Sequence, residues 1–202
     1  MIIRTILDTD LYKFTTSYAY IKLFPYAIGT FSFKDRDGTE YSDEFVERLR
    51  TEINQLSHVT LTEKELEYMI KNCRFLPRVY WEWLSSFRFQ PEKIEIRLDE
   101  NRQLHIEVND YLYKATLYEV PLLAIFSEIK NQSSGNVANL EDILYKLSEK
   151  TELSNKHQLL FSEFGTRRRF SFDVQNQVIG HLKQTAHYCI GTSNCHFAMK
   201  YG

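Results

Sequence analysis

Residues 161–169 carry the side chains best suited to chemistry in this chain. The segment reads Phe-Ser-Glu-Phe-Gly-Thr-Arg-Arg-Arg, and a stretch with helical spacing follows over 170–186. A strand, a turn and a helix in this order often form a ligand site in α/β proteins, because backbone N–H groups and the positive helix end meet there. Three guanidinium groups, those of Arg167, Arg168 and Arg169, would suit a polyanion such as pyrophosphate or a sugar phosphate. An arginine-rich turn that forms surface salt bridges is the alternative.

The elements around this turn alternate between strands and helices. We expect a helix over 119–130, a linker over 131–136 and a polar helix to about residue 155. Strands are then predicted over 158–162 and 187–190, each followed by a turn and a helix. This rhythm indicates a parallel sheet or barrel. Because two such strands cannot close a sheet, we expect the chain to be the first part of a longer protein.

The first part of the sequence has a different character, with alternating strand patterns among helices. Alternation of apolar residues predicts strands, helical spacing predicts helices, and 111–117 is interpreted as a third extended piece next to the strand pair. The expected helices are 11–24, 41–56, 62–72 and 77–86, and the expected strands are 27–34, 93–98 and 103–109. We therefore divide the chain into residues 1–117 and 118–202.

Composition excludes several classes of protein. The 202 residues include 25 basic and 27 acidic side chains, so no global charge favours nucleic acid or an anionic membrane. The longest apolar run, 120–126, is far too short to span a bilayer, and early charged residues leave no visible signal peptide. The three cysteines suggest no disulfide framework. We expect a reduced, cytoplasmic protein without nucleic-acid or membrane partners.

Several segments together resemble a known enzyme family. They are Leu7-Asp8-Thr9-Asp10-Leu11-Tyr12-Lys13, Trp83-Leu84-Ser85-Ser86-Phe87-Arg88-Phe89, Leu117-Tyr118-Glu119-Val120-Pro121-Leu122-Leu123-Ala124, Glu163 to Arg169, and Gly191-Thr192-Ser193-Asn194. In order and spacing they are similar to the N-terminal half of the nicotinate phosphoribosyltransferases, across essentially the whole chain. These enzymes make nicotinate mononucleotide for NAD biosynthesis.

The resemblance implies a fold and a reaction. The implied fold class is α/β: a mixed α/β N-terminal domain in 1–117, then in 118–202 the first part of an irregular (β/α)-barrel of the type II phosphoribosyltransferase kind. The implied reaction joins nicotinate to phosphoribosyl pyrophosphate, releases pyrophosphate and is coupled to ATP hydrolysis through a phosphorylated histidine. That histidine belongs to a Gly-Thr-x-x-His segment that this sequence does not contain, so the role is assigned to none of the histidines present.

The resemblance also assigns roles to residues of the arginine turn. Arg167 is expected to contact phosphoribosyl pyrophosphate, with Gly165 and Thr166 of the same turn as substrate-binding residues. Arg168 and Arg169 are supporting candidates, and a structural ion pair is the alternative for at least one of them. Mg²⁺ is expected to bridge the pyrophosphate oxygens, and it commonly keeps waters rather than requiring a cage of protein ligands.

Other expected contacts involve the pyridine ring. Tyr12 and Phe164 match an aromatic pair that sandwiches the ring, and ordinary core packing is the alternative for both. Ser193 and Asn194 are expected to hydrogen-bond nicotinate or ribose, with a helix cap as the alternative. The family forms homodimers with shared active sites, so Tyr12 is expected to reach the partner subunit's site.

Other functions stay open or are rejected at this point. His187, Cys189, Cys195 and His196 form no recognised zinc spacing, so no protein-bound metal is predicted. A non-catalytic module that binds phosphoribosyl compounds is one alternative function. A relative that uses quinolinate or nicotinamide is the other.

Overall fold

A three-stranded antiparallel sheet organises the first part of the chain. The computed structural model describes residues 1–35 and 38–202, and its strand order is β1-β3-β2. Phe31 of β1 lies opposite Val108 of β3, and Ile96 of β2 lies opposite Ile106. These apolar residues alternate with polar ones, so one face of the sheet packs on the core. The strands are β1 (Ile28–Lys34), β2 (Ile94–Leu98) and β3 (Leu104–Tyr111).

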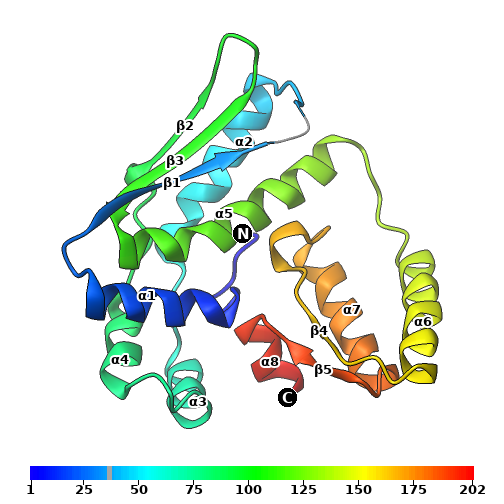
Figure 1. Ribbon diagram of the computed structural model, residues 1–202. Coiled ribbons are helices and arrows are strands. Elements are labelled where there is room, and N and C mark those ends of the chain that lie inside the picture. Colours follow the sequence, from blue (N-terminus) through cyan, green and yellow to red (C-terminus); the bar gives the residue numbers. More distant parts are fainter. Residues whose placement is uncertain (36–37) are drawn as a thin grey trace.

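Helices lie on one side of this sheet and below it in the view of Figure 1, and short 3₁₀ turns follow some of them in the chain. Two of these helices have N-terminal caps: Ser42 caps one, and Thr62 with Glu65 forms a capping box on another. Trp81, Leu49 and Phe14 are fully buried in the shared core. The elements are α1 (Leu11–Leu23), α2 (Asp43–Asn54), η1 (Gln55–His58), α3 (Glu63–Asn72), α4 (Arg78–Ser86) and η2 (Pro91–Lys93).

A long helix, α5 (Leu112–Ser133), crosses the molecule and corrects one sequence-based expectation. The extended piece predicted over 111–117 is wrong, because β3 ends at Tyr111 and α5 begins at the next residue. Ala115, Tyr118 and Leu122 are buried at helical spacing, and this burial outweighs the strand preference of the tyrosines and threonine. The expected division after residue 117 therefore falls inside α5, which packs against α1, α2, β1, β3 and the arginine turn.

After one more helix, the chain forms a βαβα unit. The prediction of parallel strands is confirmed, because β4 and β5 pair in parallel with α7 between them. A small apolar cluster of Phe172, Ile179 and Phe197 packs the helix after β4 against the helix after β5. The elements are α6 (Leu140–Lys156), β4 (Phe161–Glu163), η3 (Thr166–Arg168), α7 (Phe172–Thr185), β5 (Cys189–Thr192) and α8 (Cys195–Tyr201).

None of the helices in the described ranges is both long and apolar enough to cross a membrane.

The strands of the βαβα unit lie slightly later than predicted, at 161–163 and 189–192. The N-terminal segment passes between the part of the chain that contains the three-stranded sheet and the βαβα unit (Figure 1). It therefore contacts both parts, and this contact creates the site described below.

Tyr118 makes the stability of the fold sensitive to alkaline pH. Its ring is fully buried, its hydroxyl accepts a hydrogen bond from the Gln90 N–H at 2.9 Å, and burial raises its pKa to about 12 from an ordinary value of 10.0. Above about pH 10 the unfolded chain loses this proton while the native chain keeps it, so stability falls as pH rises toward 12. The full effect of such a shift is about 2–3 kcal/mol.

We therefore expect the Tyr118→Phe variant to lose less stability between pH 8 and 11.5 than the unmodified chain. Urea unfolding at a series of pH values measures this difference. Tyr26→Phe is the matched control, because Tyr26 is 87% exposed. An unchanged pH dependence in Tyr118→Phe would show that another group causes the alkaline loss.

Candidate functional site

Three segments that are distant in sequence meet at the ends of the parallel strands. The turn after β4 and the turn after β5 lie side by side, and the Ser193 N–H donates to the Glu163 carbonyl at 3.0 Å. The N-terminal segment joins them: Asp10 forms a β-bridge with Asn194, and the Leu11 N–H donates to the Ser193 carbonyl at 2.9 Å. Ligands commonly bind at this end of parallel strands.

Glu163 fixes the shape of the arginine turn. One carboxylate oxygen accepts hydrogen bonds from the Gly165 N–H at 2.6 Å and from the Gln175 amide at 3.2 Å, and the other accepts from the Thr192 hydroxyl at 2.5 Å. A Cβ atom at Gly165 would lie 2.7 Å from this carboxylate, so a larger residue would displace the Glu163 side chain from these hydrogen bonds. Gly165 therefore has a structural reason to be glycine, whether or not a ligand is bound.

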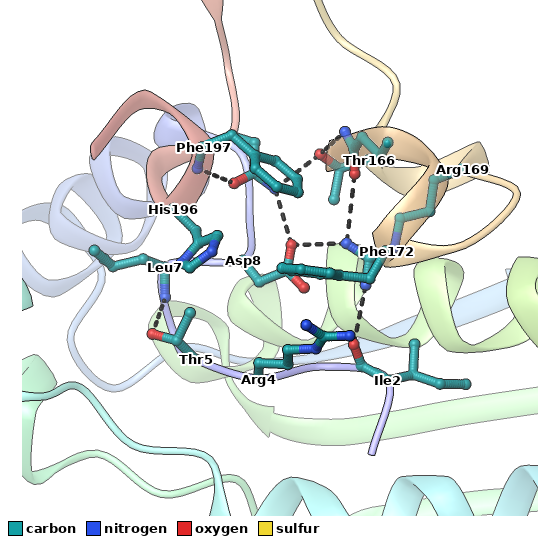
Figure 2. Close-up of polar contacts among 12 residues, drawn as sticks. Ile2, Arg4, Thr5, Leu7, Asp8, Thr166, Arg169, Phe172, His196 and Phe197 are labelled. Atoms are coloured by element: carbon teal, nitrogen blue, oxygen red, sulfur yellow. Dashed lines mark hydrogen bonds and ion pairs between the residues drawn. The ribbon is translucent and has the colours of Figure 1, made fainter. Parts of the chain in front are cut away.

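Arg169 is buried in an ion pair. The family resemblance had made it a supporting candidate for substrate binding. Its guanidinium donates to Asp8 Oδ1 at 2.8 Å and to the Ile2 carbonyl at 3.2 Å, and both charged side chains are almost completely inaccessible. Figure 2 shows Arg169 reaching from the turn to Asp8 and Ile2 beside Phe172. In this structure Arg169 ties the turn to the N-terminal segment and does not face the open side.

Thr166 and Asn194 are also fully buried, and both belong to the same network. The Asn194 amide donates to Asp8 Oδ1 at 2.9 Å and to the Thr166 hydroxyl at 3.0 Å. Its carbonyl oxygen accepts from the Phe197 N–H at 3.1 Å and so caps α8. The structure thus gives Asn194 the cap role that the sequence left as an alternative, and places Thr166 beneath the turn.

Ser193 faces Asp10 at the edge of the network. The Ser193 hydroxyl donates to Asp10 Oδ1 at 2.7 Å, and Arg167 Nε lies 3.7 Å from Asp10 Oδ2. Burial raises the pKa of the Asp10 carboxyl, while the Ser193 hydrogen bond and the Arg167 charge oppose that rise. Ser193 therefore helps to hold a buried carboxylate next to Arg167.

Arg167 is the arginine of the turn that combines fixed geometry with access to solvent. Its Nη1 donates to Glu119 Oε1 at 3.2 Å, its guanidinium carbon lies 4.9 Å from the Phe164 ring centre, and 28% of its side chain is exposed. Arg168 differs, because it is exposed and makes no side-chain hydrogen bond or ion pair with the described residues. Of the three arginines, Arg167 is therefore best placed to meet an anion.

The predicted aromatic pair lies within one chain. The ring centres of Tyr12 and Phe164 are 6.3 Å apart and the rings are tilted by 38°. The Tyr12 hydroxyl donates to Glu119 Oε1 at 3.3 Å, and burial together with the Glu119 charge raises the pKa of Tyr12 to about 12. A flat ring between two others needs about 7 Å, or two van der Waals contacts, so the pair would have to open slightly and become more nearly parallel.

Charged residues that the sequence analysis did not select complete the site. Lys13 forms an ion pair with Glu119, while Asp8, Asp10 and Glu163 accept the hydrogen bonds described above. A signal for all five was present, because each lies inside one of the segments quoted for the family resemblance. What was missing was their long-range pairing, for example of Glu163 with Thr192, 29 positions away, and of Asp8 with Asn194, 186 positions away.

An open cleft of about 510 Å³ borders the site on the β5 side. Its lining includes Glu163 and Thr192 of the site and apolar side chains such as Ile179, Leu182 and Ile190. In the described part of the chain no group of three or more histidine, cysteine, aspartate or glutamate side chains could hold a metal ion. The candidate site therefore offers charged and aromatic groups beside a partly apolar cleft.

Comparison with known proteins places this arrangement in a family. The family model described as the nicotinate phosphoribosyltransferase N-terminal domain matches residues 7–127, which is more than half of the chain. The chain belongs to the nicotinate phosphoribosyltransferase family. The model of the family itself matches residues 159–202, so the two matches contain all the segments that suggested the resemblance. That sequence-based prediction is confirmed.

Similar proteins support the same membership. Nicotinate phosphoribosyltransferase of Methanosarcina acetivorans is 39% identical over 99% of this chain and 53% of its own length. The crystal structure of nicotinate phosphoribosyltransferase from Porphyromonas gingivalis has a TM-score of 0.97 and 43% identity, covering all of this chain and 52% of that one. A putative nicotinate phosphoribosyltransferase from Saccharomyces cerevisiae gives a TM-score of 0.90 at 29% identity. The mixed α/β fold is thus that of the family, and the chain spans about half the length of these relatives.

Proposed function

We propose that this chain contributes the first half of a nicotinate phosphoribosyltransferase. The reaction would join nicotinate to phosphoribosyl pyrophosphate, giving nicotinate mononucleotide and pyrophosphate for NAD biosynthesis, with coupling to ATP hydrolysis. One observation carries the proposal beyond family membership. Arg167, a fixed and accessible guanidinium, lies directly beside the aromatic pair of Tyr12 and Phe164.

The chemistry of the reaction fits this pairing of groups. The pyridine nitrogen already has a lone pair, so the reaction needs no strong general base. The barrier lies in breaking the bond from ribose C1 to pyrophosphate, which leaves negative charge on the departing group. Catalysis should therefore consist mainly of positioning and electrostatic stabilisation. Arg167 would stabilise the leaving pyrophosphate, and Mg²⁺ would arrive with the phosphates as part of the substrate.

Tyr12 and Phe164 would hold the pyridine ring next to Arg167. We expect Tyr12→Ala to weaken nicotinate binding roughly tenfold, because ring stacking contributes about 0.5–1.5 kcal/mol beyond the buried area. Isothermal titration calorimetry with nicotinate measures this change, and Tyr26→Ala removes an exposed tyrosine outside the site as the control. Unchanged affinity would make Tyr12 an ordinary aromatic residue of α1.

We further propose a cytoplasmic homodimer with nicotinate, phosphoribosyl pyrophosphate and ATP as its small-molecule partners. The free cysteines at 73, 189 and 195 suit a reducing compartment. Since Tyr12 and Phe164 of one chain already lie 6.3 Å apart, the aromatic pair itself does not require a second subunit. A shared active site would draw other residues from the partner, and the barrel would be completed by further βα units next to β4 and β5.

The test is to look for the product directly. This chain and, in parallel, its complete open reading frame are incubated with nicotinate, phosphoribosyl pyrophosphate, Mg²⁺ and ATP, and nicotinate mononucleotide is sought by mass spectrometry. Product from the longer form would support the proposal. If neither form gives product, the nicotinate assignment fails; quinolinate and nicotinamide are then tried, and phosphoribosyl pyrophosphate binding without turnover would support a non-catalytic module.

A further inference from the structure

Glu119 of α5 connects three residues of the candidate site that come from two other elements. Its Oε1 accepts hydrogen bonds from the Tyr12 hydroxyl at 3.3 Å and from Arg167 Nη1 at 3.2 Å, while its Oε2 pairs with Lys13 Nζ. A single carboxylate thus contacts the residue expected to stack on the pyridine ring and the residue expected to meet pyrophosphate.

The ion pair with Lys13 fixes this carboxylate in place. Only 6% of the Lys13 side chain is exposed, and Glu119 itself is 21% exposed. A buried ammonium group that loses its counterion costs several kcal/mol, so Glu119 cannot swing away while Lys13 stays buried. Because Lys13 and Tyr12 are neighbours in α1, the same pair also fixes the start of that helix against α5.

Arg167 is contacted at two of its three guanidinium nitrogens. Glu119 contacts Nη1 and Asp10 lies near Nε, while Nη2 has no hydrogen-bond or ion-pair partner in the described part of the chain. A guanidinium is rigid and planar, so contacts at Nε and Nη1 set the direction of Nη2. The remaining N–H groups are therefore presented in a defined direction beside the Phe164 ring.

We propose that Glu119 is a positioning residue, which orients Arg167 toward the departing pyrophosphate and Tyr12 toward the pyridine ring. This inference rests on the proposed phosphoribosyl transfer. The competing interpretation is that Glu119 merely occupies Arg167 until a phosphate displaces it. The buried Lys13 argues against that interpretation, because it keeps Glu119 in place whether or not Arg167 binds an anion.

The first test measures the order of Arg167 without any ligand. In ¹⁵N-arginine NMR spectra of the chain, the Arg167 Nε–Hε signal is identified by its loss in Arg167→Lys. We expect an order parameter near 0.85 in the unmodified chain and below about 0.6 in Glu119→Gln. Asp110→Asn is the matched control, because it removes the charge of another partly buried pair, Lys93–Asp110, at 2.8 Å. It should lower stability and leave the Arg167 signal unchanged.

The second test separates kcat from KM in the form that makes nicotinate mononucleotide. Positioning predicts that Glu119→Gln lowers kcat about 10- to 100-fold, with KM for phosphoribosyl pyrophosphate changed less than about threefold. If Glu119 only competed with phosphate for Arg167, Glu119→Gln would lower KM for phosphoribosyl pyrophosphate and leave kcat unchanged. That result, or an ordered Arg167 signal in Glu119→Gln, would overturn the proposal. Loosening of Arg167 without any product from the unmodified protein would instead support the positioning contact and refute the proposed reaction.

Discussion

Replacing Arg167 with alanine is expected to lower kcat/KM of the complete enzyme by about 10²–10³-fold. The loss corresponds to about 3–4 kcal/mol, the amount that one donor to a developing anion supplies in a preorganised site. Glu119 and Asp10 hold the Arg167 guanidinium in place before any substrate binds. Alanine removes both the charge and this fixed direction, so kcat should fall together with kcat/KM.

Two other arginine variants make this result specific. Arg168→Ala should cost less, because the Arg168 side chain is exposed and is not held by the described residues. Arg97→Ala, on the distant strand β2, controls for the loss of a positive charge. Steady-state kinetics with varied phosphoribosyl pyrophosphate measures all three. An Arg167→Ala enzyme within threefold of the unmodified kcat/KM would remove Arg167 from the mechanism.

Replacing Arg169 with methionine is expected to lower the free energy of unfolding by about 3–5 kcal/mol. Breaking a buried ion pair from one side leaves the other charge buried without its counterion. Here the remaining charge is Asp8, which is fully buried and would keep only the Asn194 amide as a hydrogen-bond donor among the described residues. Asp8→Asn should have a similar effect, and the double variant should lose less than the sum of the two single changes.

Arg4→Met is the matched control for this measurement. Arg4 also lies over Phe172 and also pairs with an aspartate, Asp173 at 3.0 Å, but 49% of its side chain is exposed. Exposed pairs of this kind contribute about 0–1 kcal/mol. Urea unfolding at pH 7 compares the variants. If Arg169→Met were no less stable than Arg4→Met, the Asp8–Arg169 pair would not hold the N-terminal segment to the turn.

The local elements were predictable because their signals are local. Helical spacing and the Thr62–Glu65 capping box fixed α3, and alternation of apolar residues fixed β1, β2 and β3. The strand, turn and helix order also predicted a parallel pair, since two parallel strands need a crossover between them. The start of α5 was missed, because Tyr113 and Thr116 favour strands, whereas the burial of Ala115, Tyr118 and Leu122 at helical spacing depends on the fold.

The candidate site also has features that the sequence predicts and features that depend on the tertiary structure. The sequence by itself determined which segments hold the candidate functional residues, because Arg167, Tyr12 and Phe164 belong to motifs that can be recognised in a single chain. Only the tertiary structure decided what each arginine does: Arg169 pairs with Asp8, 161 positions away, and Arg167 with Glu119, 48 positions away. An arginine has the same charge in either place. Its role depends on which carboxylate the fold brings to it and on how much water reaches the pair, and neither can be read from neighbouring residues.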